Sequence, residues 1–86
     1  LIHAPARLNI ITNLYVVESA DFIFLRNLTG LTWGNLSAHI SKLENAGYVE
    51  IKKSIVNKKT HSVARLTKKG RQAFEEYKAK MLNVLK

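Results

Sequence analysis

The stretch that decides the fold comprises residues 31–49, which read LTWGNLSAHISKLENAGYV. Thr32 has the side chain of a helix N-cap, and Gly47 stands where a helix ends in a left-handed residue. Between these two residues the apolar side chains follow the i, i+4, i+7 spacing of one helical face, at Leu36, Ile40 and Leu43. We therefore predict a single amphipathic helix that begins after Thr32 and ends just before Gly47.

The opposite face of this helix is small, polar and almost uncharged. It comprises Gly34, Asn35, Ser37, Ala38, Ser41, Lys42 and Asn45. Solvated helix faces are usually dominated by Glu and Lys, because these residues favour both helix and solubility. A face of small side chains suits close approach to a groove better than it suits contact with water. It predicts a recognition helix for the major groove of DNA.

Three polar residues of this face are candidates for direct contacts. Asn35 is the first choice for a base, since its amide can bind adenine N6 and N7 together. The alternative for Asn35 is a local hydrogen bond to the backbone near the helix start. Ser37 and Ser41 suit phosphate or water-mediated contacts better, because one hydroxyl discriminates poorly between bases.

The remaining residues of the predicted DNA face contribute shape and charge. Gly34 and Ala38 would act through their lack of bulk, and Ala38 could meet a thymine methyl group. Lys42 could reach guanine or phosphate. The DNA face is completed by Thr32 and by Trp33, for which core packing and groove contact are equally consistent with the sequence.

A helix-turn-helix is predicted over about residues 22–46. Ser19 or Asp21 can cap a short helix over residues 22–28, whose buried side would consist of Phe22, Ile23, Leu25 and Leu28. The turn LTGLT, residues 28–32, contains a glycine and leads into the recognition helix. The short helix would lie over the DNA backbone.

A basic β-hairpin is predicted over about residues 48–66, with strands at 48–56 and 62–66 and a turn at 57–60. Its strands and tip carry the cationic or titratable residues Lys52, Lys53, Lys58, Lys59, His61 and Arg65. Lysines on exposed strands also protect against aggregation, which would explain one or two of them. Contact with phosphate or an adjacent minor groove would explain the whole set.

Two helices at the chain ends have more apolar surface than one small core requires. Pro5 can open a helix that runs to about Ser19, with apolar residues over an arc of about 180°. Thr67 can cap a last helix over residues 68–86 with one apolar stripe. The first helix could simply be sunk deep in the core, but a homodimer would cover both surfaces. The predicted dimer interface comprises Leu8, Ile11, Tyr15, Phe74, Tyr77, Met81 and Leu85.

The composition restricts the possible functions. The chain has 86 residues and no cysteine, so we expect one domain without disulfides and a cytoplasmic protein. Its apolar runs are far shorter than the roughly 20 residues of a membrane span. The net charge is +8, and of the 14 Lys and Arg residues only Arg7 and Arg26 precede Lys42. This one-sided charge favours a nucleic acid as the partner, with a membrane surface as the competing explanation.

Catalysis and metal binding have little support. The six acidic residues are scattered, and the sequence has no nucleophile–base pair or glycine-rich phosphate loop. His3, His39 and His61 lie in different predicted elements, so we expect neither a metal nor another cofactor. His39 lies beside the apolar stripe of the recognition helix. We expect a structural role for His39, with pH sensing as the less favoured alternative.

Two sequence blocks resemble a known family. Gly34, Asn35, Leu36, Ser37, His39, Ile40, Leu43 and Glu44 form the first block, and Leu66, Thr67, Gly70 and Arg71 form the second. With the basic hairpin between them, they resemble winged-helix regulators of the MarR/ArsR type, and most closely a small, mostly archaeal group. The resemblance implies DNA binding by homodimers built from the terminal helices. The Cys and His/Asp ligand sets of metal-sensing ArsR-type members are missing, so metal sensing is not expected.

The resulting hypothesis is an α+β winged helix-turn-helix domain that spans residues 1–86, with a three-helix core, a hairpin wing and a C-terminal dimerisation helix. It would be a non-enzymatic, homodimeric regulator that binds double-stranded DNA sequence-specifically. One alternative is a protein–protein assembly module, and another is a non-specific nucleic-acid binder. The operator and any effector do not follow from the sequence.

Overall fold

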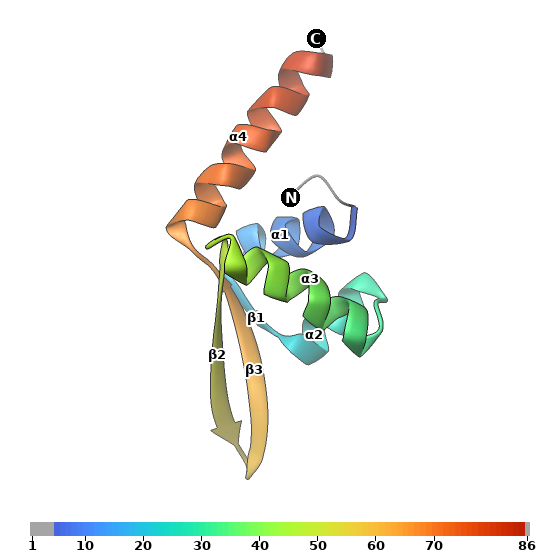
Figure 1. The fold of residues 1–86 in the computed structure, drawn as a ribbon, viewed down its shortest axis with the longest axis vertical. Helices are drawn as coiled ribbons and strands as arrows, with labels where there is room; N and C mark the ends of the chain where they lie inside the picture. Colours follow the sequence, from blue (N-terminus) through green and yellow to red (C-terminus); the bar gives the residue numbers. More distant parts are fainter. Residues whose placement is uncertain (1–4, 86) are drawn as a thin grey trace.

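The computed structural model describes residues 5–85, except for the side chains of Val56 and Leu85. The elements in chain order are α1 (Pro5–Val17), β1 (Ser19–Asp21), α2 (Phe22–Thr29), α3 (Trp33–Asn45), β2 (Val49–Val56), β3 (Lys59–Leu66) and α4 (Lys68–Leu85). Helices α1, α2 and α3 form the body of the molecule (Figure 1). The β2–β3 hairpin projects from one end and α4 from the other, so the longest axis measures 51 Å against 24 and 21 Å for the others.

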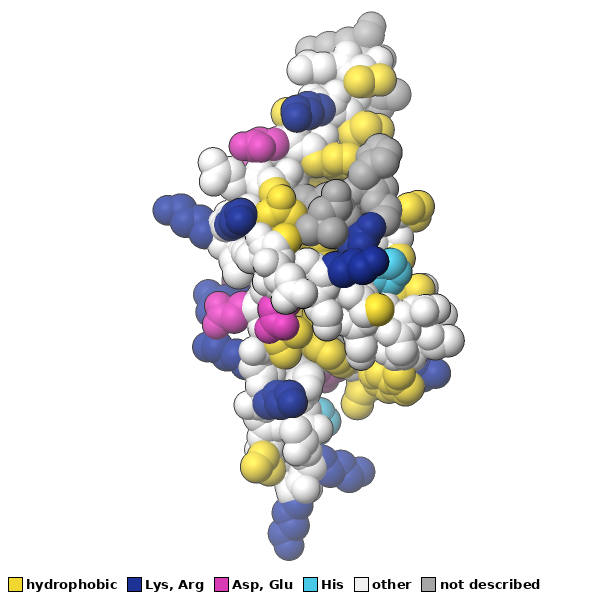
Figure 2. Space-filling model, viewed as in Figure 1, with side chains coloured by type: hydrophobic (Ala, Val, Ile, Leu, Met, Phe, Trp, Pro, Cys, Tyr) yellow, Lys and Arg dark blue, Asp and Glu magenta, His cyan; other side chains and the backbone are white. Residues whose placement is uncertain are grey.

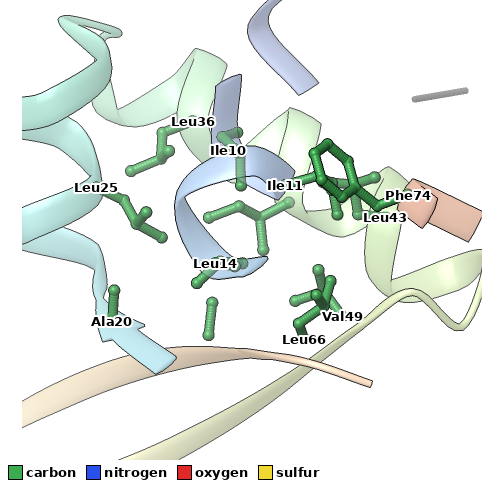
Figure 3. Close-up of a cluster of buried hydrophobic side chains, with 12 residues drawn as sticks. Ile10, Ile11, Leu14, Ala20, Leu25, Leu36, Leu43, Val49, Leu66 and Phe74 are labelled. Atoms are coloured by element: carbon green, nitrogen blue, oxygen red, sulfur yellow. The ribbon is translucent and has the colours of Figure 1, made fainter. Parts of the chain in front are cut away.

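The hydrophobic core lies where the three helices meet the base of the sheet (Figure 3). Helix α1 supplies its centre, and the side chains of Ile10, Ile11 and Leu14 have no exposed surface. The surrounding residues come from every other element: Ala20, Leu25, Leu36, Ile40, Leu43, Val49, Ala64, Leu66 and Phe74. None of the helices in the described part of the chain is long and apolar enough to cross a membrane.

Local backbone signals set the limits of α2 and α3 as the sequence predicts. The Asp21 carboxylate accepts a hydrogen bond from the Phe24 N–H (2.8 Å) and thereby caps α2. Thr32 caps α3 in the same way, through the Asn35 N–H (3.2 Å). At the end of α3, Gly47 has a φ of 82°. Its N–H donates to the Glu44 carbonyl, and the Tyr48 N–H donates to the Leu43 carbonyl. This Schellman arrangement satisfies two of the last helical carbonyls.

The sheet differs from its prediction in two respects. A short third strand, β1, pairs with β3, so the strand order is β1-β3-β2. The hairpin turn contains only Asn57 and Lys58, with φ values of 51° and 65°, which makes it a type I′ turn. The returning strand therefore begins at Lys59, three residues earlier than expected. The tight turn extends the ladder to eight cross-strand pairs and makes the hairpin longer and more regular.

The predicted buried side of α2 is only partly correct. Leu25 is fully buried and Phe22 is half-buried, but Ile23 is 50% exposed and Leu28 is 45% exposed. Helix α2 is short, and only the narrow side that carries Leu25 contacts the core. The side chains on both flanks of Leu25 therefore remain partly exposed. The flanks of α2 thus present apolar surface beside α3.

One junction links the end of α3 to the beginning of α4. The Thr67 hydroxyl donates to the Gly47 carbonyl (2.6 Å) and accepts from the Gly70 N–H (3.0 Å). The Thr67 N–H donates to the Tyr48 carbonyl (3.0 Å). A Cβ atom on Gly70 would collide with that Tyr48 oxygen and would crowd Leu66. The absence of a side chain at Gly70 therefore allows α4 to begin directly against the base of the hairpin.

We predict that Gly70→Ala lowers the free energy of unfolding by about 2 kcal/mol or more, because the new methyl group has backbone rather than a flexible side chain in its way. Urea denaturation followed by circular dichroism measures the change. Gly34→Ala is the matched control, since no atom lies within 4 Å of the place its methyl group would occupy and alanine is the better helix former. An unchanged stability of Gly70→Ala would contradict the proposed steric role of this position.

Candidate nucleic-acid interface

Helix α3 presents its predicted face to solvent. Leu36, Ile40 and Leu43 have no exposed surface, and the opposite side carries the exposed residues Gly34, Asn35, Ser37, Ala38, Ser41, Lys42 and Asn45. The local hydrogen bond at the helix start is made by the Thr32 side chain to the Asn35 N–H. Within residues 5–85 no hydrogen bond engages the Asn35 side-chain amide, so this group is available to a ligand.

Trp33 connects the two helices of the helix-turn-helix. The Arg26 guanidinium of α2 lies over the indole ring, 4.8 Å from its centroid. The Trp33 side chain nevertheless remains 47% exposed. Such a cation–π contact at an exposed site contributes roughly 0.5–1 kcal/mol. Trp33 is thus fixed in position at the start of α3 without being a core residue.

A hollow of about 360 Å³ separates the beginning of α2 and α3 from strand β3. It is lined by Asp21, Phe22, Ile23, Trp33, Thr60, His61 and Ser62. Neither Thr60 nor Ser62 is among the site residues predicted from the sequence, because only cationic or titratable residues of the hairpin are predicted to contact DNA. The available signal for the tight turn, and so for the strand register that brings both residues here, is Asn57, since Asn favours the positive φ of a type I′ turn.

The hairpin divides its charged residues between two faces, because alternate side chains of a strand point to opposite sides. Residues Val49 and Ile51 of β2 turn toward the core, and Lys53 and Ile55 continue that inner row outward. The other row of β2 contains Glu50 and Lys52, opposite Arg65 and Val63 of β3 respectively. Of the predicted hairpin contacts, Lys53 therefore shares the side of α3, whereas Lys52, Lys59, His61 and Arg65 belong to the outer row.

The tip of the hairpin is strongly basic. Figure 2 shows Lys and Arg side chains at the free end of the hairpin, and hydrophobic side chains where α2 and the start of α3 lie. Lys58 occupies the turn itself, and Lys52, Lys53 and Lys59 are exposed on the strands. The basic hairpin and the nearly uncharged face of α3 form two parts of one surface with different chemistry.

His39 lies at the edge of this surface but faces inward. Its side chain is half-buried, and its Nδ1 atom is buried with no hydrogen-bond partner among the described residues. Burial lowers the pKa of His39, and the positive charges of Arg7 and Lys42 lower it further. The neutral imidazole is therefore the form that the folded chain favours. Among residues 5–85 no three side chains could together hold a metal ion, and His3 lies outside that range.

The predicted dimer residues fall into two groups. Ile11 and Phe74 are core residues with 0% and 8% exposure, so their assignment to a dimer interface is wrong. They fill the space between α1 and α4 within the same chain. Leu8, Tyr15 and Tyr77 are half-buried, Met81 is 40% exposed, and the Leu85 side chain lies outside the described part. The exposed apolar surface of α4 also includes Leu82 (55%) and Val84 (78%).

Tyr15 fixes the direction in which α4 leaves the body. Its ring packs on Phe74 at a centroid distance of 4.8 Å, and its hydroxyl donates to the Glu75 carboxylate (3.1 Å). The Arg71 guanidinium and the Lys78 ammonium lie 4.9 and 5.6 Å from the ring centroid. All four partners belong to the first three turns of α4. The later turns extend beyond these contacts (Figure 1).

The comparisons with known proteins agree with this geometry. Residues 6–85 match the family model of the winged helix DNA-binding domain. The chain belongs to this winged-helix family. The hairpin is therefore the wing of the domain, and DNA is the class of partner. The predicted α+β winged helix-turn-helix fold is confirmed.

Similar proteins occur in archaea and bacteria. A protein of Methanocaldococcus jannaschii, described as uncharacterized, is 36% identical over 86 residues, which make up 100% of this chain and 94% of that protein. The solved transcriptional regulator homologue of Pyrococcus horikoshii OT3 has a TM-score of 0.92 at 28% identity, over 98% of this chain and 83% of its own. The resemblance to winged-helix transcriptional regulators is thereby confirmed.

Two further solved structures share the fold at lower identity. NadR in complex with 4-hydroxyphenylacetate has a TM-score of 0.76 at 24% identity, over 96% of this chain and 63% of its own. The regulator ytfH of Salmonella typhimurium has a TM-score of 0.78 at 22% identity, over 91% of this chain and 69% of its own. Both structures extend well beyond the part that matches this winged-helix domain.

The pKa of His39 leads to a prediction for acid conditions. Because its folded-state pKa lies below the ordinary value of 6.5, the unfolded chain binds a proton first as the pH falls. The free energy of unfolding should therefore decrease below about pH 6.5 and level off once folded His39 also protonates. Comparing urea unfolding of wild type and His39→Gln between pH 7.5 and 5 tests this. We expect a shallower decrease for the variant, and identical slopes would contradict the assignment.

Proposed function

We propose that this winged-helix domain is a sequence-specific transcriptional regulator that binds double-stranded DNA as a homodimer. Helix α3 would enter the major groove, and the wing would follow the backbone to the adjacent minor groove. The observation that carries the proposal is the exposed, small and nearly uncharged face of α3 directly beside a basic hairpin. One surface reads base edges and the other neutralises phosphates, as the two tasks of DNA recognition require.

Groove dimensions fit the exposed face of α3. A major groove about 12 Å wide admits a helix of about 10–12 Å diameter, side chains included, and the helix approaches the base edges most closely where its side chains are short. Gly34, Ser37, Ala38 and Ser41 meet this condition, and all four are exposed. Asn35 extends further and has an unengaged amide, which can make a bidentate contact with adenine. We therefore assign direct base readout to Asn35.

The hollow between α3 and the wing suits the DNA strand that separates the two grooves. If α3 occupies the major groove and the wing reaches the next minor groove, one sugar–phosphate backbone must pass between them. Thr60 and Ser62, which carry hydroxyl groups, line this hollow together with Trp33. Asp21 also lines it, but its carboxylate is engaged in capping α2. Phosphate contacts of this kind position the protein on the duplex.

The cations of the wing would contribute unequally. Lys53 lies on the inner face and Lys58 in the turn, and we expect both to contact phosphate directly. Lys52, Lys59, His61 and Arg65 belong to the outer row, where Arg65 stands opposite Glu50. His61 also lines the hollow, so it would lie close to the DNA strand. Lys52, Lys59 and Arg65 would act mainly through the electrostatic field that attracts DNA over several ångströms. The affinity should accordingly fall steeply with salt concentration.

The end of α4 supports the homodimer. Met81, Leu82 and Val84 are 40%, 55% and 78% exposed, and they lie close together within two turns of α4. A contiguous apolar surface of this type is usually covered by another protein surface. A second copy would supply a matching helix and would place two recognition helices on one duplex. The two helices would then read a pseudo-palindrome whose half-sites lie about 34 Å apart, one turn of DNA.

Fluorescence anisotropy on the DNA upstream of the chain's own coding sequence tests the proposal, with a scrambled duplex as the control and several salt concentrations. We expect a preference of about 10³-fold or more for one duplex, as specific binders show. Equal and steeply salt-dependent binding would indicate a non-specific binder. Failure to bind either duplex at low salt would favour a protein-assembly role, for which the exposed apolar flanks of α2 offer a surface.

For Asn35→Ala we expect a loss of specificity rather than of general affinity. Removal of one bidentate base contact should weaken binding to the preferred duplex by about 1–3 kcal/mol and leave scrambled DNA nearly unaffected. The same anisotropy titration measures both values. Asn9→Ala is the matched control, because Asn9 is an exposed helical asparagine on α1, outside the proposed DNA face. Equal losses on both duplexes would contradict base readout by Asn35.

For the dimer we expect Met81→Glu to yield monomers, since a buried and unpaired carboxylate is costly at an apolar interface. Sedimentation velocity distinguishes the two masses. Asn83→Glu adds the same charge on another side of the same helical turn and should remain dimeric. A monomeric wild type at micromolar concentration, or a dimeric Met81→Glu, would contradict the role assigned to this surface of α4.

A further inference from the structure

Ile55 is an unusual residue for the end of a basic hairpin. It lies on β2, opposite Thr60 and two residues before the Asn57–Lys58 turn, and its side chain is 77% exposed. Single exposed apolar residues are ordinary on protein surfaces, and isoleucine favours strands. Its exposure alone therefore carries no functional meaning. The position of Ile55 relative to α3 and to the wing lysines is what distinguishes it.

The alternation of β2 places Ile55 on the inner face of the wing. The row begins at Val49, which is 2% exposed and touches the core, continues through half-buried Ile51, and extends through Lys53 to Ile55. Helix α3 packs on this side of the sheet, where its buried residues meet Val49 in the same core. The inner row thus leads from the recognition helix toward the tip and ends in an apolar side chain.

Cationic residues flank Ile55 along the hairpin. Lys53 precedes it in the same row, and Lys58 follows in the turn. A minor groove offers matching chemistry, because phosphates line its two edges and the C–H groups of deoxyribose form its walls. Proteins that bind there frequently place apolar side chains such as isoleucine against the bases. A flat protein partner would not require lysines on both sides of a single isoleucine.

We propose that Ile55 is the minor-groove contact of the wing and that it makes the wing prefer A·T pairs. An A·T pair presents only acceptors in the minor groove, whereas G·C adds the protruding N2 amino group of guanine. That amino group would meet the isoleucine side chain, which can neither accept its hydrogen bond nor yield space. This inference rests on the proposed function only in placing α3 in the neighbouring major groove.

Base substitution in the DNA tests this contact independently of α3. Replacing adenine by 2,6-diaminopurine adds an amino group in the minor groove and preserves the major-groove edge that α3 would read. The substitution is made throughout both the upstream and the scrambled duplex, and dissociation constants are measured by anisotropy. We expect wild-type affinity to fall about tenfold, within the range for the loss of one base-pair contact. Ile55→Ala should lose less than about twofold.

Two control variants separate a groove contact from other effects. Val16→Ala removes an equally exposed apolar side chain, 74% exposed on α1, and should retain the full tenfold penalty. Lys58→Ala should bind every duplex more weakly but should also retain the penalty. Equal penalties in wild type and Ile55→Ala would overturn the inference, as would the absence of any penalty in wild type. Because the scrambled duplex gives the same comparison, a failure of sequence preference would be distinguished from a failure of the Ile55 contact.

Discussion

The hydrogen bonds of Thr67 hold together the parts of the molecule that would meet DNA. Its hydroxyl bridges the Gly47 carbonyl at the end of α3 and the Gly70 N–H in the first turn of α4, and its N–H binds the Tyr48 carbonyl before β2. Helix α3, the wing and α4 are therefore held in fixed directions at one junction. Gly70 is part of the same constraint, because any side chain there would push α4 away from Tyr48.

Three elements with different surfaces extend from this junction. Helix α3 presents a smooth face, the wing carries charge outward, and α4 carries an apolar stripe in the opposite direction (Figure 1). Because the core is small and centred on α1, it cannot cover the far ends of the wing or of α4. Those ends remain exposed, and their chemistry differs: Lys53, Ile55 and Lys58 at one end, and Met81, Leu82 and Val84 at the other. The basic surface of the wing and the apolar surface of α4 are thereby kept apart.

Local signals explain why much of the fold could be predicted. Asp21, Thr32 and Gly47 act within a few residues of themselves, so the limits of α2 and α3 follow from capping chemistry alone. Strand β1 could not be found this way. Its three residues are too few for their alternation to predict a strand, and they form one only because β3 offers them a ladder. The partial exposure of Ile23 and Leu28 likewise depends on how narrow the contact of α2 with the core is.

The sequence by itself determined the two faces of α3, the basic hairpin and the long final helix, because periodicity, caps and charge are properties of neighbouring residues. Only the tertiary structure decided which side chains share a surface. It placed Ile11 and Phe74 in the core between α1 and α4, and it brought Thr60 and Ser62 beside Trp33. Such contacts join residues far apart in the chain, and they depend on the register of β2 with β3 and on the packing of whole elements.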